Sequence, residues 1–114
     1  MCRALKVLCA AAGRERLLEL KRATVSAHWE LVGGASSLDG LVSQVDGSAP
    51  DVVVIDVGLS QDAALRVRER KPTVRIVSVG GSLDGADGSA GIENVRDVIL
   101  GVPPVGGPVG RRGG

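Results

Sequence analysis

Short apolar runs alternate along the chain with stretches in which apolar residues recur every three or four positions. The most continuous run, DVVVIDV at 51–57, is typical of a strand that is covered on both faces. Strands are predicted at 5–10, 29–32, 51–57, 74–79 and 95–102. Helices are predicted at 14–24, 38–45 and 62–70. The segment 82–91 is rich in glycine and has little periodicity, so a helix there is expected to be short or missing.

Strands that alternate with helical patterns predict βαβ units with right-handed crossovers, and therefore an α/β fold with an open parallel sheet. One domain is expected over residues 1–102. Residues 103–114 consist mostly of glycine and proline. Such a segment buries too little surface to offset the entropy of ordering it, so it is expected to be a linker or a disordered tail.

Composition narrows the classes of function. The 114 residues suit a single domain with an aliphatic core, because the chain has one Trp and neither Phe nor Tyr. The net charge is +1 and no basic stripe is present. Binding of nucleic acid or of a membrane surface is therefore not expected, since both depend on clustered positive charge. No apolar segment is long enough to span a bilayer.

The two cysteines, Cys2 and Cys9, lie close together near the N-terminus. A secreted domain of this size usually needs more cysteines for a disulfide framework. Both thiols are therefore expected to be reduced, which predicts a cytoplasmic protein.

Three consecutive segments carry a resemblance to a known family: WELVGGASSLDGLVSQV, PDVVVIDVGLS and ALRVRERKPTVRIVSVGG. Together with the first strand they resemble the receiver domains of bacterial response regulators, over residues 4–81. The resemblance implies a flavodoxin-like sheet of five strands in the order 2-1-3-4-5, with helices on both faces and a degenerate fourth helix. It also places Asp56 where receivers carry the aspartate that accepts a phosphoryl group.

Other positions depart from the receiver pattern. The family has an acidic pair after the first strand that holds magnesium, and the matching residues here are Ala11 and Ala12. Methyl groups cannot replace the oxygen ligands that magnesium prefers. The family also has a lysine after the fifth strand, whereas this chain has no lysine after Lys71.

The switch region of receivers is also altered. The family's hydroxyl residue at the end of the fourth strand matches Val79 or Gly80, with Ser78 close by. The aromatic switch residue is missing, because the chain has neither Tyr nor Phe. The resemblance is therefore to a degenerate receiver, or pseudo-receiver.

The resemblance implies a signalling domain that works by protein contact and not as an enzyme, with no cofactor and no metal ion. The expected partner is another protein or a fused downstream domain, and a homodimer is one candidate. Pseudo-receivers occur at the N-terminus of MinD-like ATPases of pilus assembly and cell-pole positioning, and the Gly/Pro tail is compatible with such a fusion.

Two alternatives remain open. In the first, the domain is a working response regulator that is phosphorylated on Asp56. In the second, VLCAAAGRERLLEL resembles the start of phosphotransferase-system IIB domains, and Cys9 is the nucleophile of a phosphocarrier.

Overall fold

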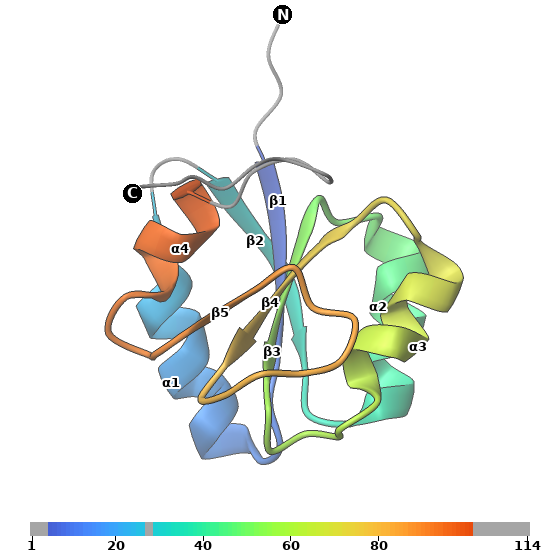
Figure 1. Cartoon of the computed structure of the whole chain (residues 1–114), viewed down its shortest axis with the longest axis horizontal. Helices are drawn as coiled ribbons and strands as arrows, with labels where there is room; N and C mark the ends of the chain where they lie inside the picture. The colour runs from blue at the N-terminus through green and yellow to red at the C-terminus, as the bar shows by residue number, and fades with distance from the viewer. Residues whose placement is uncertain (1–4, 27–28, 102–114) are drawn as a thin grey trace, which may run out of the picture.

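Five parallel strands form one sheet in the order β2-β1-β3-β4-β5 (Figure 1). The structure is a computed structural model that describes residues 5–26 and 29–101. The strands are β1 (Leu5–Ala10), β2 (Trp29–Ala35), β3 (Val52–Asp56), β4 (Arg75–Val79) and β5 (Gly88–Ala90). The predicted α/β class, the open parallel sheet and the strand order are confirmed. The predicted tail at 103–114 lies outside the described residues.

Helices cover both faces of the sheet, as predicted. Their bounds are α1 (Arg14–Thr24), α2 (Leu38–Ser48), α3 (Ala63–Arg70) and α4 (Val95–Gly101). Helices α1 and α4 lie on one face, and α2 and α3 lie on the other (Figure 1). Within the described ranges, no helix is long and apolar enough to cross a membrane.

Strand β3 lies at the centre of the core, and all five of its residues are buried. Its side chains alternate between the two faces: Val53 and Ile55 pack against α2 and α3, whereas Val52 and Val54 pack against α1 and α4. This two-sided burial explains why the strand is a continuous apolar run without polar alternation.

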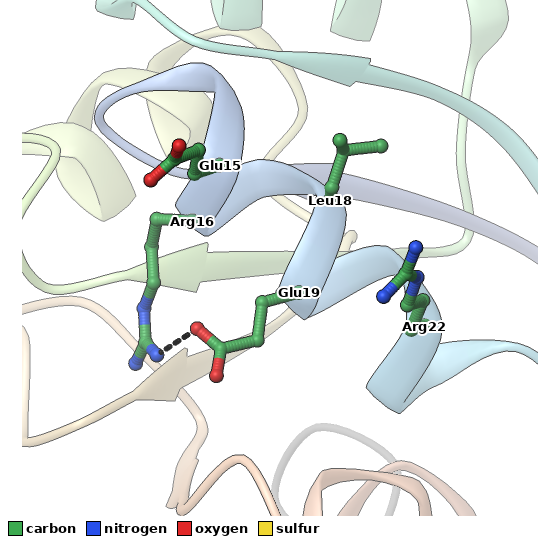
Figure 2. Close-up of a pocket in the computed structure, with 5 residues that line it drawn as sticks. All are labelled: Glu15, Arg16, Leu18, Glu19 and Arg22. Carbon is green, nitrogen blue, oxygen red and sulfur yellow. Dashed lines mark hydrogen bonds and ion pairs between the residues drawn. The ribbon is translucent and has the colours of Figure 1, made fainter.

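Helix α1 is amphipathic. Leu20 and Thr24 are buried against the sheet. The opposite side carries exposed residues, among them Glu15, Leu18 and Arg22 (Figure 2).

Strand β2 is longer than the predicted 29–32, because it continues through Gly33 and Gly34 to Ala35. A Cβ atom on Gly33 would clash with the side chain of Gln44, and one on Gly34 would clash with that of Lys21. The Gln44 amide also donates a hydrogen bond to the carbonyl oxygen of Gly34. The glycines therefore allow side chains from α1 and α2 to lie directly over this edge strand.

The predicted strand at 95–102 is wrong. Residues 95–101 form α4, while the fifth strand is the short Gly88–Ala90 segment, which pairs with β4. Val95, Val98 and Ile99 are spaced three and four residues apart, and this spacing places them on one side of a helix. Val95 and Ile99 are buried in the cluster beside α1. In a strand, Asp97 would instead lie on the same face as Val95 and Ile99 and would be buried with them.

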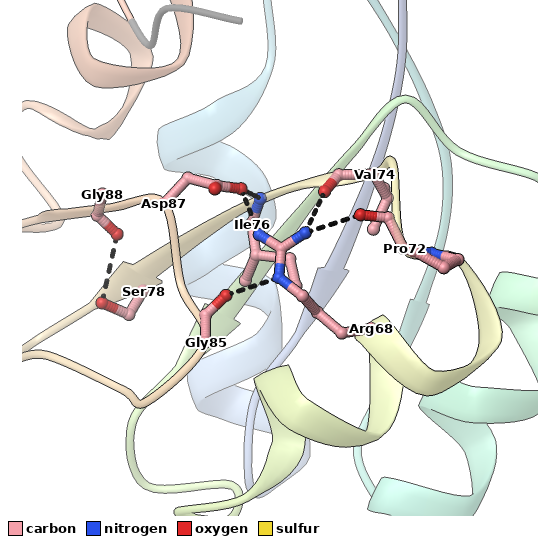
Figure 3. A network of polar contacts seen from close by, with 8 residues as sticks. All are labelled: Arg68, Pro72, Val74, Ile76, Ser78, Gly85, Asp87 and Gly88. Carbon is pink, nitrogen blue, oxygen red and sulfur yellow. Dashed lines mark hydrogen bonds and ion pairs between the residues drawn. The ribbon is translucent and has the colours of Figure 1, made fainter. Parts of the chain in front are cut away.

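The connection between β4 and β5 contains no helix, as the glycine-rich sequence predicted. Leu83 and Ala86 pack from this connection onto the core beneath α2 and α3. Arg68 of α3 holds the connection in place (Figure 3). Its guanidinium donates hydrogen bonds of 2.6–3.2 Å to the carbonyl oxygens of Pro72, Val74 and Gly85 and to the carboxylate of Asp87.

We expect Arg68→Lys to destabilise the domain by about 1–3 kcal/mol, because one ammonium group cannot reproduce four bonds that diverge from a planar guanidinium. The free energy of unfolding in urea measures the effect. The matched control is Arg66→Lys, because Arg66 makes only an exposed 3.7 Å ion pair with Asp62. Equal losses in the two variants would contradict the role assigned to Arg68.

Candidate functional site

Asp56 lies at the edge of the sheet where the parallel strands end. It is the last residue of β3, only 7% exposed, and its register partner on β4 is Val79. The end of β1, at Ala10, pairs with the neighbouring Ile55. Ligand sites of open α/β sheets form at this edge, so Asp56 is correctly placed for the role that the resemblance gives it.

Both carboxylate oxygens of Asp56 are already hydrogen-bonded. Oδ1 accepts a 3.0 Å hydrogen bond from Nε of Arg16 and lies 3.0 Å from its Nη2 in an ion pair, and Oδ2 accepts a 3.2 Å bond from the backbone N–H of Gly58. The Asp56 side chain is 10% exposed and that of Arg16 is 35% exposed. The ion pair is therefore partly shielded from water, and the Asp56 charge is balanced from within the protein.

Arg16 is shared between two acids. Its Nη1 donates a 2.9 Å bond to Glu19, one turn further along α1 (Figure 2). The bonds to Glu19, and then those to Asp56, raise the pKa of Arg16 above its ordinary value. The guanidinium therefore remains charged between the two carboxylates, and the three groups together carry one net negative charge.

The two positions that match the family's acidic pair lie beside this group. Ala11 is fully buried in the cluster beneath α1 and α4, and Ala12 is exposed. Neither methyl group can ligate a cation, and Asp56 already binds Arg16. In the described part of the chain, no three His, Cys, Asp or Glu side chains come close enough to hold a metal ion. These five residues (Asp56, Arg16, Glu19, Ala11 and Ala12) are here called the corner. They do not fit the magnesium that receivers bind.

The candidate switch residues are divided between the two faces of the sheet. Val79 faces the same side as Asp56, whereas Ser78 pairs with Ile55 and points to the other side. The Ser78 hydroxyl donates a 2.6 Å bond to the carbonyl oxygen of Gly81. Gly80 directly follows β4 and lies beside Asp56. Its φ of +89° is one that only glycine adopts readily. Among the described residues, no hydroxyl group bonds Asp56.

Cys9 does not belong to this corner. It lies inside β1 between Gly34 and Val54, fully buried. Its Sγ atom lies 3.1 Å from the Thr24 hydroxyl. Burial raises the pKa of the thiol to about 11, although the hydrogen bond to Thr24 and the charge of Lys21 act in the opposite direction. Cys9 therefore packs in the core as a small apolar residue.

The sequence analysis overlooked Arg16. Its position in the first turn of the helix that follows β1 could have indicated that it lies near Asp56, because that turn and the end of β3 lie at the same edge of the sheet. Pairing it with Asp56, forty residues away, required the strand order.

No protein-family model and no curated protein matches this sequence. Solved structures do match. The response regulator domain of Thermotoga maritima CheB is 18% identical, with a TM-score of 0.70 over 86% of this chain and 92% of that one. A CheY-like receiver domain protein from Methanospirillum hungatei is 13% identical, with a TM-score of 0.71 over 86% and 92%. This chain has the receiver-domain fold.

A third structure is the signal receiver domain of a modulated diguanylate cyclase from Desulfovibrio desulfuricans. It is 16% identical, with a TM-score of 0.71 over 88% of this chain and 94% of that one. At these identities the likeness establishes the receiver fold alone. The function has to be inferred from the residues of the corner.

The ion pair at the corner predicts a coupling between its two members. Arg16→Met leaves a buried carboxylate without its cation, and we expect a loss of about 1–3 kcal/mol in the free energy of unfolding. In an Asp56→Asn background the same change should cost less than half as much. Urea denaturation of the four proteins of this double-mutant cycle measures the coupling.

The control for this cycle is Arg66→Met, which removes only an exposed pair and should change stability by no more than about 0.5 kcal/mol. Strictly additive effects of Arg16→Met and Asp56→Asn would show that the pair does not stabilise the corner.

The burial of Cys9 predicts an unreactive thiol. In a Cys2→Ser variant, a thiol reagent at pH 8 should label Cys9 at least about a hundredfold more slowly in the native protein than in urea, because the thiol is buried and its pKa is raised. The time course of labelling by intact mass is the measurement. Native labelling as fast as in urea would mean that β1 does not hold Cys9 in the core.

Proposed function

We propose that this receiver-fold domain acts in signal transduction by protein contact, as a pseudo-receiver, without magnesium-dependent phosphorylation of Asp56. The observation that carries the proposal is the ion pair between Arg16 and Asp56. A phospho-accepting aspartate needs an accessible carboxylate oxygen and a cation that neutralises the incoming phosphoryl group. Here both oxygens are bonded within the protein, and the carboxylate is almost fully buried.

The charge of the corner supports the same conclusion. Asp56 and Glu19 together outweigh Arg16 by one negative charge, so these three groups offer an anionic phosphodonor no net attraction. Ala11 and Ala12 supply no carboxylate with which a metal ion could reverse that sign. The domain is proposed not to be an enzyme and to need no cofactor.

Each of the two alternatives has an observation for or against it. The position of Asp56 at the tip of β3 favours a working receiver, because a phosphodonor approaches the sheet from this edge. The complete burial of Cys9 and its raised pKa oppose a phosphocarrier, because the thiolate is the nucleophilic form and it must be reachable.

The proposed partner is another protein or a downstream domain of the same polypeptide. The matched receiver from Desulfovibrio desulfuricans belongs to a modulated diguanylate cyclase, so this fold does occur beside an output domain. Fusion to a MinD-like ATPase and a cytoplasmic location remain predictions from the sequence.

The deciding experiment is intact-mass analysis after incubation with acetyl phosphate and magnesium. We expect no phosphoryl adduct on the wild-type chain, on Asp56→Asn or on Cys9→Ser. A receiver domain that retains its acidic pair, treated in parallel, is the positive control.

The variants distinguish the three functions. An adduct that disappears only in Asp56→Asn would overturn the proposal in favour of a working receiver. An adduct that disappears only in Cys9→Ser would favour the phosphocarrier.

A further inference from the structure

Four residues line the outer side of α1 and are here called the α1 stripe: Glu15, Leu18, Arg22 and Val25, the last of which caps the helix. Their spacing of three, four and three residues places them along one side of the helix. Leu18 is 49% exposed and Val25 is 55% exposed. The one other large hydrophobic residue exposed in the described part of the chain is Leu65, on α3.

The two charges of the stripe have opposite signs and lack ion-pair partners among the described residues. Glu15 and Arg22 are seven residues apart, about 10 Å along the helix axis, which is too far for a contact between them. Their neighbours Arg16 and Glu19 are already paired with each other. A surface hollow runs along this side of the helix between the two free charges (Figure 2).

This arrangement is self-complementary under a two-fold rotation. If two α1 helices lie antiparallel about an axis near Leu18, Glu15 of each copy faces Arg22 of the other. The interface then contains two equivalent ion pairs and places the two Leu18 side chains together at the axis. A two-fold interface requires one surface to carry both halves of the contact, and the stripe does so.

We propose that the α1 stripe is a homodimer interface in which two copies of the chain pack their α1 helices antiparallel. This inference rests on the proposed function in one respect, which is that the dimer forms without a phosphodonor. Because exposed ion pairs and two leucines give a small interface, we expect a dissociation constant of about 10 µM to 1 mM.

The first test is sedimentation over a concentration series at low salt. Glu15→Arg or Arg22→Glu alone should weaken dimerisation at least about tenfold, because each places like charges opposite one another. The double variant Glu15→Arg/Arg22→Glu restores opposite charges and should return the affinity to within about threefold of wild type. The matched control is Glu69→Arg, an exposed reversal on α3, which should change nothing.

A second test does not depend on measuring a weak affinity. In a Cys2→Ser background, a short bis-maleimide should cross-link Leu18→Cys into a covalent dimer, and adding Glu15→Arg should reduce its yield at least about fivefold. Leu65→Cys, exposed on another helix, is the control for random collision.

The results separate this inference from the proposed function. A monomer at every concentration, with no Leu18→Cys cross-link above the Leu65→Cys control, would overturn the dimer and leave contact with another protein untouched. A dimer that does not respond to either charge reversal would also overturn it, because another surface would then be used. A stripe-dependent dimer that appears only after acetyl phosphate treatment would instead contradict the phosphate-independent function.

Discussion

A parallel sheet whose central strand is buried on both sides must be covered on both faces, and this constraint organises the chain. Strand β3 presents Val53 and Ile55 to one layer of helices and Val52 and Val54 to the other. Receivers meet the constraint with a helix between their last two strands, which this chain lacks. Here the connection contributes Leu83 and Ala86 to the core, and Arg68 of α3 bonds its Gly85 carbonyl oxygen and its Asp87 carboxylate. A single guanidinium thus takes over part of a helix's structural role, because it fastens the connection to α3 and satisfies the backbone oxygen of Gly85.

A second arginine, Arg16, determines the surroundings of Asp56 at the edge of the sheet where the strands end. At that edge Arg16 supplies, from within the protein, a positive charge beside Asp56. A metal ion exchanges with solvent and leaves room for a phosphoryl oxygen, whereas a guanidinium is fixed to the helix and occupies the oxygen that it bonds. In the proposed function, the pair therefore keeps Asp56 as a structural carboxylate. It also links α1, the helix that carries the proposed dimer stripe, to the end of β3.

Much of the fold could be predicted from local sequence. The run at 51–57 marks the central strand because burial on both faces removes polar alternation, and the glycines at 82–91 predict a short or missing helix there. The prediction was wrong at 95–102, where a short apolar run was interpreted as a strand although Val95, Val98 and Ile99 have helical spacing. The true fifth strand, Gly88–Ala90, has no apolar pattern of its own. Its pairing with β4 at the edge of the sheet defines it, and a single sequence does not contain that pairing.

For the site, the sequence by itself determined which groups are available: a carboxylate at the end of a buried strand, alanines where the acidic pair of receivers lies, and a cysteine inside an apolar run. Only the tertiary structure decided what those groups contact. It placed Arg16 within 3.0 Å of Asp56 and turned Ser78 away from it. Charge and hydrogen bonding act over a few ångströms in space, whereas these partners are separated by tens of residues along the chain. Their contacts therefore depend on the order and register of the strands.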